Sequence, residues 1–322
     1  MSWYHRGAMA LPLEPPVTPQ LARSSGELPD GDGWFYEPKL DGFRAVVFVD
    51  GSDLFVQSRN GKTLGRYFPE LRFPEGRYIL DGELVIRADG GGENFEALQE
   101  RIHPAASRVA RLAEEKPSTF VAFDILARDD ESLLDAPLTE RRATLEQVVG
   151  DPLELIPSTP DRSEAEPWLQ TAEGVIAKRA DAPYKPGERV GMVKVKRVRT
   201  IDCAVVGWRP GKAEGTVGSL ILGLYDPDGK VYVVGHTSGF TAKYARELVG
   251  IVTPHETGEH GASDPNRWSA DRDREWRGLR PDLVAEVSFD HKSGHRIRHG
   301  ARLLRFRDDK RAQECALEQL ES

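Results

Sequence analysis

The stretch EPKLDGFR at residues 37–44 lies between an aromatic run and an alternating apolar run. A lysine in water is protonated and a poor nucleophile, but beside other cations it gives up its proton more easily and can attack phosphorus. We therefore interpret Lys39 as a candidate nucleophile, with Asp41 orienting the amine or serving a metal ion and Arg44 reaching a ribose or phosphate oxygen. A surface turn is the alternative interpretation of such a Lys-x-Asp-Gly tetrapeptide.

The bulk composition describes a soluble globular protein with room for two domains. The chain has 322 residues, of which 39% are hydrophobic and 30% charged, and this length allows two separate cores. No apolar run approaches the roughly 20 residues of a membrane helix, and the N-terminus lacks the apolar segment of a secretory signal. Two cysteines, Cys203 and Cys315, are too few for a disulfide framework. We expect a cytoplasmic protein without a membrane partner.

The first two thirds of the sequence predict an α+β domain rich in strands. Alternation typical of strands appears at residues 45–50, 53–57, 78–87, 119–126, 173–178 and 190–196. Helical stretches fall at about residues 94–103, 106–115, 140–149 and 163–171. Because the helices occur irregularly among the strands, the pattern differs from the regular alternation of strands and helices in a doubly wound fold.

The pattern changes near residue 200, where short β segments and Gly-rich turns take over. These segments fall at residues 202–208, 217–225, 230–236 and 283–289, with one helical stretch capped by Thr241. Few strands and a single helix favour a small barrel such as an OB-fold. We place the domains at residues 1–200 and 201–322, and we interpret residues 254–281 as a polar loop.

The net charge of −8 conceals a basic segment near the C-terminus. Residues 292–311 hold eight lysines and arginines against Asp308 and Asp309. The basic residues are Lys292, Arg296, Arg298, Arg302, Arg305, Arg307, Lys310 and Arg311. This segment is either a solvated basic face or a surface that binds nucleic-acid phosphates.

Two acidic residues stand in the otherwise apolar segment LDGELV at residues 80–85. Alternation along a strand sends Asp81 and Glu83 to one face and Leu84 to the other. Acids in such a strand need a partner or a function. They are either salt-bridged structural groups or partners of a ribose hydroxyl or a metal ion.

Two further segments offer contacts to a nucleotide or to nucleic acid. Phe123 lies in the apolar segment FVAFDIL and belongs either to the core or to a platform on which a base stacks. Arg59 precedes NGKT, which resembles the end of a P-loop, but Val56 occupies the position of the first glycine. We therefore reject the P-loop and interpret Arg59 as a phosphate contact.

Two strand segments late in the first domain complete the set of charged candidates. Glu173 begins the segment EGVIAK, and Lys194 and Lys196 alternate with apolar residues in MVKVK. The two lysines therefore project from one face, where they repel each other unless an anion lies between them. A bound phosphate is the natural candidate for that anion.

These motifs, in this order, resemble the successive signatures of the covalent nucleotidyltransferases, which include ATP-dependent DNA ligases, RNA ligases and mRNA capping enzymes. The resemblance covers about residues 10–320. The sequence that flanks the motifs is similar to that of the small bacterial ATP-dependent DNA ligases, most closely the actinobacterial ligase C type. It rests on Lys39-x-Asp41-Gly42, Asp81-Gly82-Glu83, Phe123-Asp124, Glu173-Gly174, Lys194-x-Lys196 and Arg307-x-x-Lys310. The implied fold is an adenylation domain of antiparallel sheets with flanking helices, followed by an OB-fold.

The resemblance implies roles in nucleotide binding for five residues. Lys39 forms a covalent phosphoramidate with AMP. Glu37 meets the adenine amino group, Phe123 stacks on the ring and Glu83 binds the ribose, while Arg44 contacts ribose or phosphate.

It also implies roles for the charged residues around the phosphates. Lys194 and Lys196 hold the α-phosphate, Glu173 with Asp41 serves Mg²⁺ or Mn²⁺, and Arg59 meets the 5′-phosphate of a nick. From the second domain, Arg307 and Lys310 orient the leaving pyrophosphate. The contacts to DNA come from Arg59 and from the basic segment, at Arg296, Arg298, Arg302 and Arg305.

The implied activity is ATP-dependent sealing of nicks in double-stranded DNA during repair, replication or recombination. AMP passes from the lysine to the 5′-phosphate, and the 3′-hydroxyl then displaces it. We expect a monomer at the bacterial nucleoid, with a repair polymerase or primase as a candidate partner. The alternatives are an RNA ligase or capping enzyme and a non-catalytic module that binds DNA ends. The chain lacks the cysteine cluster of the NAD⁺-dependent ligases.

Overall fold

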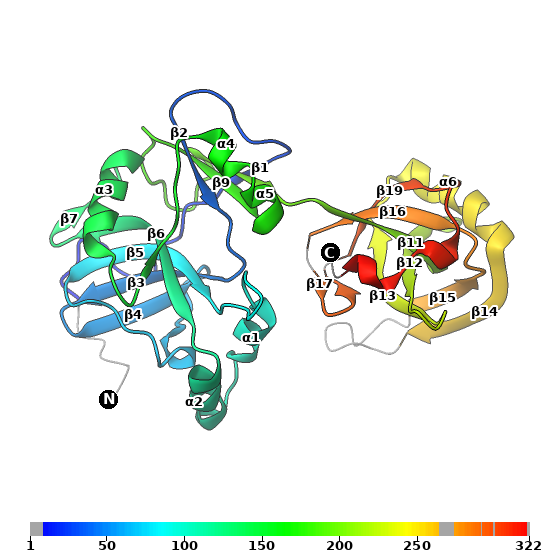
Figure 1. The fold of residues 1–322 in the computed structure, drawn as a ribbon, viewed down its shortest axis with the longest axis horizontal. Coiled ribbons are helices and arrows are strands. Elements are labelled where there is room, and N and C mark those ends of the chain that lie inside the picture. Colours follow the sequence, from blue (N-terminus) through cyan, green and yellow to red (C-terminus); the bar gives the residue numbers. More distant parts are fainter. Residues whose placement is uncertain (1–8, 264–273, 291, 299, 321–322) are drawn as a thin grey trace. The chain divides into compact units, whose positions relative to one another are not determined.

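The computed structural model describes residues 9–263, 274–290, 292–298 and 300–320. The chain divides into two compact units, Met1–Arg197 and Val198–Ser322 (Figure 1). Each unit has its own buried apolar core. The two are therefore described separately.

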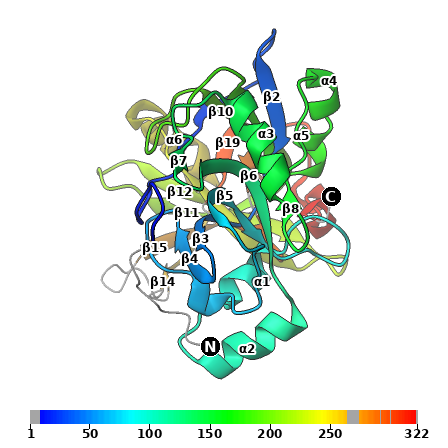
Figure 2. The same cartoon turned by 90° about the vertical axis from the view of Figure 1, so that its left-hand side faces the viewer.

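The first unit is built on a larger and a smaller sheet. The larger sheet has the order β4 (Asp53–Ser58), β3 (Phe43–Asp50), β5 (Arg77–Val85), β6 (Thr119–Arg128) and β7 (Glu131–Ser132), with β8 (Glu154–Leu155) also on β6. The smaller sheet has the order β1 (Arg23–Ser25), β10 (Met192–Lys196), β9 (Gly174–Arg179) and β2 (Trp34–Pro38). All neighbours are antiparallel except the pairs β1/β10 and β6/β8. Figure 2 shows β3, β4 and β5 side by side.

Short helices accompany both sheets. They are α1 (Phe95–Glu100), α2 (Ala106–Glu115), α3 (Leu138–Val148), α4 (Arg162–Ala165) and α5 (Trp168–Thr171). Helices α1 and α3 pack against the larger sheet, and α4 and α5 against the smaller one. Asn94 caps α1, because its side chain accepts the backbone N–H of Ala97 at 3.0 Å. The single helix expected at residues 163–171 is wrong: the chain forms α4 and α5 on either side of Pro167, and proline cannot donate in a helix interior.

The smaller sheet separates polar from apolar side chains by strand alternation. Tyr36, Val175, Ala177 and Val195 point into a buried cluster with Leu28 and Ala165. The residues between them in these strands therefore point to the opposite face. This face carries charged side chains and forms part of the pocket described below.

The second unit is a seven-stranded antiparallel sheet that surrounds one core. Its strands are β13 (Val231–Ser238), β12 (Val217–Tyr225), β11 (Arg199–Pro210), β15 (Arg274–Leu279) and β14 (Glu256–Ser263), with β16 (Val284–Phe289) on β11 and β19 (Arg302–Phe306) on β16. The long strand β11 pairs with β16 through its first half and with β15 further on. Thr241 caps the helix α6 (Ala242–Val252), whose Leu248 and Val252 are buried in this core.

The polar loop expected at residues 254–281 is wrong for residues 256–263 and 274–279, which form strands. Strands β14 and β15 pair there as an antiparallel ribbon, and the Trp208 indole N–H donates to Glu256 at 3.0 Å. The ribbon carries few apolar side chains, so its sequence lacks the alternation by which a half-buried strand is recognised. Residues 264–273, including Trp268, lie outside the described residues.

Candidate active site

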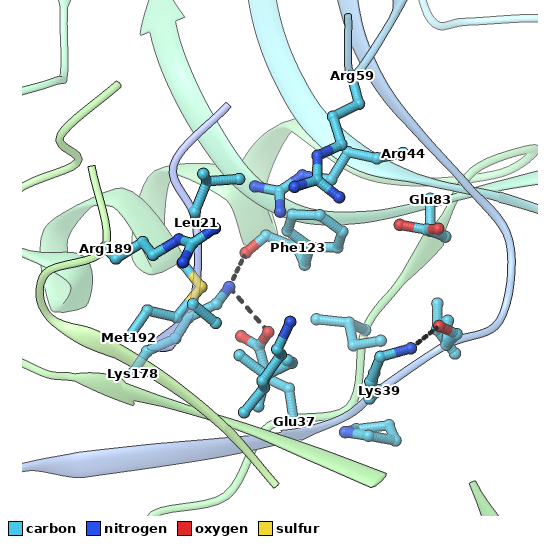
Figure 3. Close-up of a pocket in the computed structure, with 16 residues that line it drawn as sticks. Leu21, Glu37, Lys39, Arg44, Arg59, Glu83, Phe123, Lys178, Arg189 and Met192 are labelled. Carbon is cyan, nitrogen blue, oxygen red and sulfur yellow. Dashed lines mark hydrogen bonds and ion pairs between the residues drawn. The ribbon is translucent and has the colours of Figure 1, made fainter. Parts of the chain in front are cut away.

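A pocket of about 220 Å³ opens in the first unit and contains many of the charged residues singled out from the sequence (Figure 3). Its lining residues are Leu21, Ala22, Glu37, Pro38, Lys39, Leu40, Arg44, Arg59, Glu83, Phe123, Ile156, Ile176, Lys178, Arg189, Met192 and Lys194. Asp41, Glu173 and Lys196 are not among them.

Each sheet of the first unit contributes one wall of the pocket. Across the smaller sheet, Lys194 pairs with Ile176 and Ile176 with Glu37, so these side chains share a row on one face. Across the larger sheet, Arg44 pairs with Glu83. The pocket therefore combines polar groups from strands that are distant in sequence.

Lys39 lies just after β2 and is partly buried in the pocket. Its backbone N–H donates to Gly174 at 2.9 Å, and its carbonyl accepts the N–H of Glu173 at 3.2 Å. Its side-chain amine donates to the carbonyl of Leu40 at 3.2 Å. The backbone contacts bring Glu173 next to Lys39 although the two are far apart in sequence.

A buried ion pair lies at the end of the pocket occupied by Glu37. The Lys178 amine is 2.8 Å from the Glu37 carboxylate and donates to the carbonyl of Phe123 at 2.9 Å. Burial raises the pKa of Glu37, and Lys178 opposes that effect. Sequence analysis missed Lys178, although it shares a face with Ile176 on an apolar strand and the argument made for Lys194 would have found it.

The two acids of strand β5 have different surroundings. Asp81 is fully buried and accepts two hydrogen bonds from Arg44, at 2.8 and 2.6 Å. Glu83 lines the pocket, where burial raises its pKa to about 7 against the opposing effects of Arg44 and Lys39. Asp81 therefore fits the salt-bridged interpretation, whereas Glu83 faces the cavity, and its role toward a ribose hydroxyl or a metal ion stays a prediction.

Several cations at the pocket have no anionic partner. Within the part of the chain that the structure describes, Arg59, Arg189 and Lys194 form no ion pair and no side-chain hydrogen bond. Burial lowers the pKa of Lys194, and the neighbouring cations, Lys196 first among them, lower it further. Sequence analysis missed Arg189, which lies in a loop without periodicity. Three cations without partners indicate a site for an anion.

The carboxylates expected to hold a metal ion lie near Lys39. Asp41 and Glu173 are both close enough to raise the pKa of Glu93, after the larger effect of burial. The described residues contain no cluster of three or more histidine, cysteine or acidic side chains arranged to hold a metal. Mg²⁺ in phosphate-transfer sites is typically held by one or two carboxylates together with substrate phosphates, and Asp41 and Glu173 fit such a partial ligand set.

In the second unit, carboxylates of that unit hold Arg307 and Lys310. Lys310 lies 2.8 Å from Asp202, and Arg307 lies 3.4 Å from the same carboxylate. Arg307 also donates two hydrogen bonds of 2.8 Å to Asp309. Lys310 therefore has a raised pKa, chiefly through its hydrogen bond to Asp202.

The basic segment is less uniform than its sequence indicates. Arg296 and Arg302 are exposed, and Arg298 is partly buried. Arg305 is paired with Glu286 at 2.6 Å. Arg305 is exposed as well but is held by Glu286, so Arg296 and Arg302 are the exposed arginines of the four that form no ion pair with a described residue.

Comparison with known protein families accounts for both units. Residues 19–196 match the model of the ATP dependent DNA ligase domain, and residues 213–310 match that of the ATP dependent DNA ligase C terminal region. The chain belongs to the ATP-dependent DNA ligase family. This confirms the predicted family, and it confirms the α+β fold with an OB-fold as its second part. ATP and a divalent metal ion are the cofactors of this family.

Individual relatives cover almost the whole chain. DNA ligase C1 of Mycolicibacterium smegmatis is 43% identical, across 98% of this chain and 96% of its own length. DNA ligase C of Mycobacterium tuberculosis is 39% identical, across 97% and 96%. The structure of a mycobacterial DNA ligase D complexed with ATP and MES is 27% identical with a TM-score of 0.50, across 93% of this chain and 98% of that one.

A search of the described helices found none that is long and apolar enough to cross a membrane.

Proposed function

We propose that this DNA ligase seals nicks in duplex DNA through a covalent adenylate on Lys39. The observation that carries the proposal is the placement of Lys39 in one pocket with Glu83 and Lys194, beside Arg59 and Arg189, which form no ion pair among the residues that the structure describes. In this assignment, residues 1–200 form the adenylation domain and residues 201–322 the OB-fold domain. The division of the chain at Arg197 supports that boundary.

The proposed reaction proceeds in three steps. The Lys39 amine, having lost a proton to solvent, forms a bond to the α-phosphorus of ATP while the bond to pyrophosphate breaks. An oxygen of the 5′-phosphate then attacks the same phosphorus, and Lys39 leaves and regains a proton. Finally the 3′-hydroxyl oxygen attacks the 5′-phosphorus, its proton is lost, and AMP leaves.

The pocket supplies positioning and charge for the first step. Phe123 offers a face for the adenine and Glu37 an acceptor for its amino group, while Glu83 accepts from a ribose hydroxyl. Lys194 and Lys196 neutralise charge on the α-phosphate as the leaving group departs.

The remaining charged residues act on the leaving group, the metal ion and the DNA. Arg307 and Lys310 orient the pyrophosphate, and Arg59 binds the 5′-phosphate of the nick. Asp41 and Glu173 hold a divalent ion, which neutralises phosphate charge when bound.

Sealing of two nicked duplexes tests the role of Lys39. We expect Lys39→Ala to seal no ordinary nick in the presence of ATP, because no adenylate can form on the enzyme. The same variant should still seal a nick whose 5′-phosphate already carries AMP, because the third step does not use the lysine. Lys116→Ala, at an exposed lysine of the same unit, is the control and should seal both duplexes. Sealing of the ordinary nick by Lys39→Ala contradicts the proposal.

Sealing of nicked RNA, labelling with GTP and binding of nicked DNA separate the alternative functions. An RNA ligase would seal nicked RNA in preference to DNA, and a capping enzyme would acquire GMP from GTP. A non-catalytic module would bind nicked DNA and never acquire a nucleotide.

For the contact with DNA we propose that Arg296 and Arg302 bind the phosphate backbone. Reversing both charges to glutamate should weaken binding to nicked duplex at least tenfold and flatten its salt dependence. Formation of the lysyl adenylate should be unchanged. Unchanged affinity would contradict the assignment.

We also propose that the enzyme acts as a monomer at the nucleoid of a bacterial cell. A repair polymerase or primase fits as a partner, because extension of a primer provides the 3′-hydroxyl that sealing consumes. Light scattering of the enzyme alone tests the monomer.

A further inference from the structure

Tyr184, in the segment between β9 and β10, lies almost completely buried beside the pocket and has no role in the reaction as proposed. Its hydroxyl donates to Asp81 at 2.6 Å and accepts the backbone N–H of Gln20 at 2.9 Å. These partners are distant from Tyr184 in sequence. One hydroxyl therefore joins three segments of the first unit.

Through Asp81 this hydroxyl is connected to Arg44. The Asp81 carboxylate accepts two hydrogen bonds from Arg44, and the oxygen Oδ2 receives both the Arg44 Nη2 and the Tyr184 hydroxyl. The Arg44 guanidinium lies 4.8 Å from the centre of the Phe123 ring and lines the pocket. The carboxylate is buried, so its orientation depends on these two donors.

The same hydroxyl also accepts a hydrogen bond from the segment that precedes the pocket residue Leu21. Gln20, which donates its backbone N–H to Tyr184, also donates from its side-chain amide to the carbonyl of Val190 at 2.6 Å. The next residue, Leu21, donates its N–H to Glu188 at 2.8 Å and lines the pocket, as does Arg189. Because Gln20 and Leu21 have these hydrogen bonds of their own, loss of the Tyr184 hydroxyl alone should leave this segment in place, and its main effect should fall on Asp81 and Arg44.

Burial raises the pKa of Tyr184 well above its usual value, and the charge of Asp81 adds to that effect. The side chain therefore remains a phenol, which can donate to Asp81. Phenylalanine would keep the ring and its contact with the Arg141 guanidinium, 5.7 Å from the ring centre, but would leave Asp81 and the Gln20 N–H each without one partner.

We propose that Tyr184 is a positioning residue for nucleotide transfer, whose hydroxyl orients Arg44 toward ATP by way of Asp81. This inference rests on the proposed function, because Arg44 must act on the nucleotide for its orientation to matter. Tyr184 itself does not contact the reacting atoms.

A double-mutant cycle with Arg44 tests the proposal. The rate of lysyl-AMP formation would be measured against ATP concentration for the wild type, Tyr184→Phe, Arg44→Ala and the double variant. We expect Tyr184→Phe to lower kcat/KM about tenfold in the wild-type background. In the Arg44→Ala background, the same change should lower it less than twofold, because its effect passes through Arg44.

Tyr78→Phe is the matched control, because Tyr78 is likewise a buried tyrosine that donates a hydrogen bond. Its acceptor is the backbone carbonyl of Pro74, and neither residue lines the pocket. It should lower the melting temperature but leave kcat/KM within twofold in both backgrounds. Equal losses from Tyr184→Phe in both backgrounds, or an equal loss from Tyr78→Phe, would overturn the role of Tyr184 while wild-type adenylation stands. A wild type that forms no lysyl-AMP would instead overturn the proposed function, and this inference with it.

Discussion

Both units of this ligase gather cationic side chains, but the pocket of the first unit combines paired cations, Arg44 and Lys178, with cations that form no ion pair among the described residues. In the pocket of the first unit, Arg59, Arg189 and Lys194 have no ion pair among the described residues. In the second unit, carboxylates hold Arg307 and Lys310 at distances of 2.8 to 3.4 Å. Like charges without partners lower the stability of the fold, whereas ion pairs change the free energy of unfolding little overall. The pocket of the first unit is therefore suited to receive an anion, and the pyrophosphate contact proposed for Arg307 and Lys310 would require them to leave their carboxylates.

The largest expected effect comes from removing a pocket cation that carries no partner. Lys194→Ala should slow formation of the lysyl adenylate by about 10²-fold, because it removes charge that neutralises the α-phosphate in the transition state. Lys185→Ala, at a lysine paired with Asp135 outside the pocket lining, should change the rate by less than threefold. Single-turnover labelling with ATP measures both. A rate for Lys194→Ala within threefold of the wild type would show that this unpaired pocket cation does not act on the nucleotide, which contradicts the comparison of the two units.

A second test uses the pH dependence of stability that follows from the raised pKa of Glu83. Its pKa is raised to about 7 in the folded chain, so stability is full at low pH and is lost as pH rises from about 4.5 through 7. Glu83→Gln cannot ionise. Its free energy of unfolding, relative to that of the wild type, should therefore rise by about 2 kcal/mol as the pH is raised from 5 to 8.

Urea unfolding of the first unit at several pH values measures this gain. Glu75→Gln, at an exposed glutamate, is the control and should follow the wild type at every pH. A stability difference between Glu83→Gln and the wild type that does not vary with pH would show that the pocket does not disfavour the charged carboxylate.

The third test concerns the paired cations of the second unit. Asp202→Asn removes the carboxylate that Arg307 and Lys310 share, and it should lower the stability of that unit by about 1–2 kcal/mol. Asp228→Asn, at an exposed turn residue, should have no such effect. Urea unfolding followed by tryptophan fluorescence compares them. Equal stability of Asp202→Asn and the wild type would mean that the pairing contributes nothing to the fold.

The smallest expected effect is on stability at the pocket itself. Arg59→Ala and Arg189→Ala should each change the free energy of unfolding by no more than about 0.5 kcal/mol, since both side chains are exposed and neither guanidinium is paired with a described residue. Both should nevertheless weaken the binding of ATP or of the nick, as measured by titration. A clear loss of stability in either variant would show an unrecognised structural role.

Much of the site could be predicted because its residues lie on strands. Alternation in MVKVK places Lys194 on a polar face, and the smaller sheet has that face in the pocket. The same rule gives Asp81 and Glu83 one face but cannot say which acid is paired, because the partner Arg44 comes from another strand. The roles assigned to these residues stay predictions.

What could not be predicted depends on contacts between distant segments or on weak patterns. Arg189 and Tyr184 lie in a loop, where no periodicity marks a side chain as buried or as part of a pocket. Asp202 has no feature in the sequence that identifies it as the partner of Lys310, more than a hundred residues later. The ribbon of β14 and β15 was missed because both of its strands are largely polar.

The central claim is that Lys39 becomes the carrier of AMP within a pocket where Arg59, Arg189 and Lys194 form no ion pair with any described residue. Intact-mass measurement after incubation with ATP and Mg²⁺, followed by peptide mapping, tests it directly. The account predicts one added adenylate, located on Lys39 and absent from Lys39→Ala. An adenylate on another residue, or a wild-type mass that ATP leaves unchanged, would contradict it.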